Sequence, residues 1–86
     1  MAKILVQEQL IACANIFDHM TSVYSWKGEL KQSSEVVLLL KSKTRLYNKI
    51  RKRVESLHPY ECPCIIAWSL DQGNKEYLEW INKNLN

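Results

Sequence analysis

The amino-acid sequence predicts a single α+β domain, residues 1–86, of the ferredoxin-like (split βαβ) type without its first strand. The predicted elements follow the order helix, strand, strand, helix, strand, helix. Two antiparallel strands between helices, with a later strand reached through a helical crossover, are typical of that fold. A domain of this size buries only about 60% of its unfolded surface. Because the predicted core is small, we expect oligomerisation to stabilise it.

The first two predicted elements are a helix over residues 2–12 and a long strand from Cys13 to Trp26. In the helix, apolar residues lie on either side of a polar patch, and no breaker intervenes. The strand is rich in β-branched and aromatic residues, which favour a pleated sheet. We expect an interruption at residues 18–20, where Asp, His and Met break that pattern.

A hairpin is predicted to follow the first strand. Gly28 can take the positive φ that a tight turn needs, so residues 27–29 form the turn. The partner strand covers residues 30–43 and contains an unbroken apolar run at residues 36–40. A strand without apolar–polar alternation is typical of one covered on both faces. We therefore expect a helix layer on one face and a neighbouring subunit, or more sheet, on the other.

Residues 44–57 predict the clearest helix, with Thr44 as its N-cap. A single apolar stripe recurs at helical spacing and consists of Leu46, Ile50, Val54 and Leu57. The remaining surface is basic, which is typical of a solvated helix face. A nucleic-acid patch is the alternative, but no stacking aromatics are interleaved with the basic residues. Pro59 cannot lie in a helix interior, so the helix ends near Leu57 and holds His58 at its end.

The corner from His58 to Cys64 combines two prolines with several residues that could carry chemistry. It leads into an apolar segment, residues 65–70, which predicts another strand. After a polar turn, residues 75–85 predict a last helix. Its apolar stripe consists of Tyr77, Leu78, Ile81 and Leu85, and Trp80 lies beside that stripe.

Five blocks of sequence, in order and covering nearly the whole chain, resemble the CutA family of divalent-ion tolerance proteins. Ile11–Ile16 resembles the family's LAACVNI, Thr21–Glu29 its TSVYWWKGE, Ser34–Lys43 its SEVLLLIKT, His58–Pro63 its HPYEVP and Gly73–Trp80 its GNPDYLEWL. The resemblance implies a ferredoxin-like fold assembled as a tight homotrimer, in which long hairpin strands pair across subunits. It also implies a role in the response to copper or other divalent metal ions. Some animal members are instead linked to the anchoring of acetylcholinesterase at membranes.

The chain departs from the family pattern at three places. The opening strand and the start of the first helix are absent, so Met1 falls inside that helix, and a metal-binding Cys of the family has no counterpart. Leu57 stands where the family often has a further His before His58. Cys62 and Cys64 flank Pro63, where the family has other residues.

The absent strand matters because the first strand is central in a ferredoxin-like sheet. Its loss leaves two strands facing a gap with unpaired backbone groups. A wrongly chosen start codon, a truncated gene, or a sheet closed by inward movement of the 65–70 strand would each account for it. We expect a truncated version of the usual chain, which mass spectrometry of the native protein tests.

The candidate metal ligands are His58, Glu61, Cys13, Cys62 and Cys64. Cys62 and Cys64 are two residues apart, so on a strand both thiolates could approach one Cu(I) ion. The alternative is that they are small hydrophobes of a core strand, because free cysteine is often buried. His58 could bind a metal together with Glu61. Cys13 lies at a helix-to-strand junction, where burial is the simpler role.

Catalysis has little support in the sequence. No Ser/His/Asp set, glycine-rich phosphate loop or carboxylate pair is indicated, and Glu61 near His58 has no nucleophile beside it, so we expect no enzyme. His19 is expected to be exposed. Three aromatic residues are expected to pack in the hairpin and at an interface rather than to form a ligand cage: Tyr24, Trp26 and Trp68.

Two functions of different classes remain. The first is a small trimeric protein that binds copper or another divalent metal ion, with His58 and Glu61 as ligands. The second is a structural or signalling trimer that binds no metal and holds a small molecule or a partner protein in its intersubunit clefts. The basic face of residues 49–53 and the loss of family ligand positions favour the second.

Charge and cysteine content set the expected partners and compartment. The net charge of +3 permits nucleic-acid binding without arguing for it, and the strand motif of an RRM is absent. The first residues turn polar too soon for a signal sequence, and no long apolar run is present. With an odd count of three Cys, we expect reduced thiols in a cytoplasm. The expected partner is the chain itself, without nucleic acid or membrane.

Overall fold

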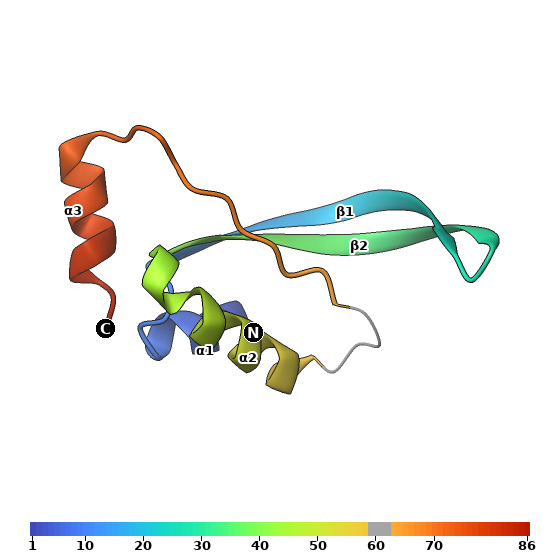
Figure 1. The fold of residues 1–86 in the computed structure, drawn as a ribbon, viewed down its shortest axis with the longest axis horizontal. Coiled ribbons are helices and arrows are strands. Elements are labelled where there is room, and N and C mark those ends of the chain that lie inside the picture. The colour runs from blue at the N-terminus through green and yellow to red at the C-terminus, as the bar shows by residue number, and fades with distance from the viewer. Residues whose placement is uncertain (59–62) are drawn as a thin grey trace.

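A computed structural model describes residues 1–58 and 63–86 of the chain (Figure 1). A two-stranded antiparallel sheet forms a long hairpin, and helices gather at the end of the hairpin opposite its turn. In chain order the elements are α1 (Ala2–Gln7), β1 (Cys13–Trp26), β2 (Glu29–Lys41), a 3-10 turn η1 (Thr44–Leu46), α2 (Tyr47–Leu57) and α3 (Lys75–Lys83). The described residues therefore have α+β architecture.

The hydrophobic core lies where α1, α2 and α3 meet the base of the hairpin. Its buried residues come from α1, η1, α2 and α3, from the link before β1 and from the chain end after α3, and they are Leu5, Leu10, Ile11, Ala12, Leu46, Ile50, Ile81 and Leu85. Ala14 and Leu40, which are cross-strand partners, pack against this cluster from the sheet. The core therefore fixes the base of the hairpin and the buried faces of the helices.

The first helix is shorter than predicted. It ends at Gln7 rather than at residue 12, and Gln9 then takes a left-handed φ of 60°. The Leu10 N–H still reaches the Leu5 carbonyl at 3.1 Å, which closes the turn. The buried Ile11 follows. The chain leaves the helix here because it must lead into β1, and this tertiary demand overrides the local helical pattern.

The predicted hairpin is confirmed, but its turn is residues 27–28 rather than 27–29, and β2 covers Glu29–Lys41 rather than residues 30–43. Cys13 pairs with Lys41 at the base and Trp26 pairs with Glu29 at the tip. Lys27 and Gly28 both have positive φ, 51° and 80°, which is the conformation of a two-residue type I′ turn. The twist of this turn matches that of the strands.

The predicted interruption at residues 18–20 takes the form of a bulge. β1 continues through it, but the register shifts between Phe17 and Met20. His19 has a φ of 59°, and its N–H donates to the Asp18 carboxylate at 2.9 Å. A bulge bends and twists a strand without ending it. The polar residues therefore mark an irregularity in the ladder and not a break in the strand.

The apolar run of β2 is covered unevenly by its own chain. Leu40 packs on the core, whereas Val36 is 57% exposed and Val37 is 37% exposed. Phe17, the cross-strand partner of Val37, is 48% exposed. Val37 and Leu40 are three residues apart and lie on opposite faces of the strand. The helices thus cover one face at the base of the hairpin, and the other face is open in the single chain.

The predicted helix at residues 44–57 is present but begins differently. Its first turn, Thr44–Leu46, is a 3-10 turn, and the α-helix proper starts at Tyr47. Thr44 is therefore not the N-cap; that position belongs to Lys43, and no side chain makes a capping hydrogen bond there. Leu46 and Ile50 are buried as the stripe predicts. The helix ends at Leu57, as predicted from Pro59.

The predicted strand at residues 65–70 is wrong. These residues run past the hairpin without entering a sheet (Figure 1), and Ile66, Trp68 and Leu70 are 75%, 70% and 68% exposed. A β-strand needs a neighbouring strand to accept and donate its backbone hydrogen bonds, and no described residue pairs with residues 65–70 in this way. The idea that this strand moves inward to close the sheet is wrong for the same reason.

The last helix is present and is held at its C-terminal end. α3 ends at Lys83 rather than at residue 85, and Ile81 is buried within it. Beyond it, the N–H of Asn86 donates to the Gln9 carbonyl at 3.1 Å. The Arg45 guanidinium donates to the Asn86 carbonyl oxygen. Of the predicted stripe, Tyr77 and Leu78 remain 36% and 41% exposed.

Candidate functional site: the corner after α2

The corner from His58 to Cys64 carries most of the candidate ligands. His58 is its first residue and lies at the end of α2. α2 delivers it, because the buried Leu46 and Ile50 fix the helix on the core. The N–H of His58 donates to the Val54 carbonyl at 2.8 Å, so the last helical turn holds its backbone. With φ −136° and ψ 86°, His58 has left the helical conformation, and its side chain is exposed.

The other described end of the corner is Cys64. Its thiol is free of any disulfide and exposed. The next residue, Ile65, is half-buried, and its carbonyl accepts a hydrogen bond from the Tyr47 hydroxyl at 2.8 Å. Tyr47 is the first residue of α2, so the chain returns along the helix after leaving its far end.

The remaining candidate ligands are separate from these two ends or lie outside the description. Cys13 begins β1, is half-buried and pairs with Lys41 across the sheet. Glu61 and Cys62 lie outside the described residues. Among residues 1–58 and 63–86, no three side chains of His, Cys, Asp or Glu form a group that could hold a metal ion. The described residues alone therefore do not make a complete metal site.

The side chains that were expected to have no ligand role are mostly exposed. His19 lies in the bulge, 3.9 Å from the Asp18 carboxylate and open to solvent. At the hairpin tip the Lys27 ammonium lies 5.8 Å from the ring centre of Trp26. Tyr24 accepts a hydrogen bond from the Ser33 hydroxyl across the hairpin. Trp68, at 70% exposure, is not packed by the single chain.

An ion pair joins the end of α1 to α2. The Arg53 guanidinium contacts the Glu8 carboxylate through two nitrogens, at 2.9 Å from Nε to Oε1 and 2.8 Å from Nη2 to Oε2. Hydrogen bonds from Arg53 lower the pKa of Glu8 below its ordinary value; desolvation opposes this shift, and the guanidinium charge adds a smaller lowering. The same contacts raise the pKa of Arg53. The pair is open to solvent and serves as a tie between helices.

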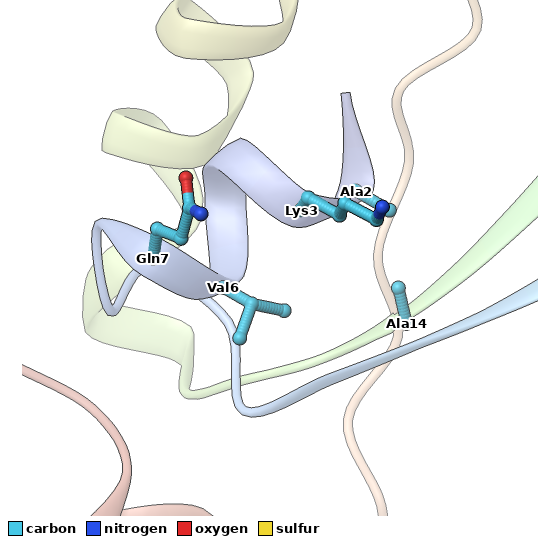
Figure 2. A pocket seen from close by; sticks show the side chains of 5 residues that line it. All are labelled: Ala2, Lys3, Val6, Gln7 and Ala14. Atoms are coloured by element: carbon cyan, nitrogen blue, oxygen red, sulfur yellow. The ribbon is translucent and has the colours of Figure 1, made fainter.

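A shallow groove of about 320 Å³ lies between α1 and the start of β1 (Figure 2). Its wall and rim are formed by Ala2, Lys3, Val6, Gln7 and Ala14. The groove is mostly apolar and contains no candidate metal ligand, so it is separate from the corner after α2.

Several of these contacts have no signal in the sequence. A tyrosine at the start of a helix gives no sign of what its hydroxyl reaches, so the contact of Tyr47 with Ile65 cannot be predicted from the sequence. The Glu8–Arg53 pair joins residues 45 positions apart. No pattern of local spacing finds a contact of that range, whereas the i,i+4 pair Arg51–Glu55, at 2.7 Å, could have been read from spacing.

The fold and the corner together define a class: a small α+β protein with a long hairpin and a Pro-framed corner that carries imidazole and thiol groups. The family model described as CutA1 divalent ion tolerance protein matches residues 1–84. The chain belongs to this family.

Relatives of known sequence agree with this assignment. The divalent-cation tolerance protein CutA of Thermus thermophilus is 46% identical over 83 residues, covering 96% of this chain and 81% of the relative. That of Pyrococcus horikoshii is 39% identical over 79 residues, covering 92% of this chain and 76% of the relative. Protein CutA of Mus musculus is 38% identical over 82 residues, 95% of this chain but 46% of the relative. The chain therefore spans about half the length of the mouse protein.

Solved structures share the fold. The Thermus thermophilus divalent cation tolerance protein superposes with a TM-score of 0.94 at 45% identity, covering 99% of this chain and 82% of the other. CutA1 of Oryza sativa gives a TM-score of 0.95 at 33% identity, covering 99% and 78%. A CutA of Archaeoglobus fulgidus, which is described as periplasmic, gives 0.94 at 33% identity, covering 99% and 82%. In the part of this chain that the structure describes, no helix has the length and apolar character needed to cross a membrane.

Proposed function

We propose that this chain is a homotrimeric, non-enzymatic protein of divalent-cation tolerance that binds copper or another divalent metal ion at the corner after α2. The observation that carries this proposal is the family match over residues 1–84, which includes the His58–Pro63 block. The relatives at 46% and 39% identity are named for divalent-cation tolerance.

The chemistry of the corner supports metal binding there. The exposed imidazole of His58 suits copper and zinc, and the exposed thiol of Cys64 suits Cu(I). Glu61 and Cys62 lie between them in sequence and are proposed to complete the ligand set. Cys13, half-buried at the base of the hairpin, is the least suited of the candidate ligands. When bound, the metal would be held rather than used for catalysis.

The open face of the hairpin supports the trimer. Phe17 and Val37 form an exposed apolar pair on the face that the helices leave uncovered. Large apolar patches on a soluble chain mark sites of association. In the proposed assembly the hairpins pair across subunits, and the completed fold is ferredoxin-like. We place the protein in a cytoplasm, where Cys13 and Cys64 stay reduced, with itself as partner and without nucleic acid or membrane.

Copper titration followed by calorimetry tests the metal proposal on the wild type, His58→Ala and His19→Ala. His58→Ala should weaken binding, because it removes an imidazole ligand from the corner. His19→Ala should bind as the wild type does, since that exposed histidine lies in the bulge of β1. Equal binding by all proteins would remove His58 from the site.

A second candidate is a trimer that binds no metal and holds a small molecule or partner protein in its intersubunit clefts. It is favoured by the basic face of residues 49–53, on which Lys49 and Lys52 are exposed. A purified protein without metal, and without metal affinity below the millimolar range, would support this candidate over the first.

A further inference from the structure

We draw no further inference here: the strongest candidate, the exposed apolar patch of Ile66, Trp68 and Leu70 on the segment that runs past the hairpin, carries none, because nothing in the described part of the chain shows what covers it.

Discussion

At the residue scale, hydrogen bonds made by backbone groups, one to the backbone and one to a side chain, rather than burial hold the described groups of the candidate site. His58 and Cys64 are both exposed, yet His58 is tied to Val54 and the carbonyl beside Cys64 is tied to Tyr47. The position of His58 at a helix end was predicted, because Pro59 excludes a longer helix. The contact of Tyr47 with Ile65 could not be predicted, because it depends on where the chain lies after the corner.

The Glu8–Arg53 pair gives a prediction for stability and pH. Because the folded state lowers the pKa of Glu8, its contribution to the free energy of unfolding is full above the unfolded pKa. It is lost as the pH falls through the lower, folded pKa. Glu8→Gln should therefore unfold at lower denaturant concentration near neutral pH, and the difference from wild type should shrink on acidification.

The matched control for that experiment is Asp71→Asn in the segment before α3, which removes an exposed carboxylate that lies outside the helices and outside the described ion pairs. Urea unfolding at several pH values compares the proteins. High salt should also reduce the effect of Glu8→Gln, because the pair is solvent-exposed. A difference between Glu8→Gln and wild type that persists at low pH would contradict the ion-pair explanation.

At the element scale, the hairpin and α2 follow their local sequence closely, and the segment after the corner does not. The turn at Lys27–Gly28 has the conformation that its glycine allows, and the α2 stripe buries Leu46 and Ile50. These elements satisfy most of their hydrogen bonds internally or with a sequence neighbour. The apolar run at 65–70 has the composition of a strand, but no described residues form a partner strand for it. Composition alone is therefore not enough to form a strand there.

The hairpin turn gives a second prediction. Gly28 has a φ of +80°, and a Cβ added there would meet nothing within 4 Å, so backbone strain is the whole cost of a side chain. Gly28→Ala should destabilise the protein by about 1 kcal/mol or more. Gly28→Asn should cost less, because asparagine tolerates the left-handed region. Thermal and urea unfolding measure both, and equal costs for Ala and Asn would show that the turn conformation is not the cause.

At the scale of the whole molecule, the helices cover the base of the hairpin, and the rest of the hairpin is exposed in the single chain. Its longest dimension is 46 Å, set by a hairpin that extends well beyond the helices (Figure 1). The apolar side chains along it, Phe17 and Val37 among them, meet solvent in one chain. Burial of this surface is the main stabilisation that an assembly would add.

Light scattering tests the trimer directly. The wild type should have three times the 10.1 kDa mass of the chain. Val37→Asp should lower the mass, because it buries an unpaired charge in the proposed interface. Asn48→Asp adds the same charge on the exposed surface of α2 and should leave the mass unchanged. A wild-type protein with the mass of one chain would contradict the homotrimer.

The sequence by itself determined the α+β class, the hairpin with its turn, and the stripe and end of α2. Through five blocks that resemble the CutA family, it also determined the family. Each of these depends on residues near one another in the chain, where periodicity, glycine and proline act locally. The tertiary structure decided the early end of α1, the bulge that replaces a break in β1, the unpaired state of residues 65–70 and the contact of Tyr47 with Ile65. These depend on which distant segments meet, and local propensity carries no information about that.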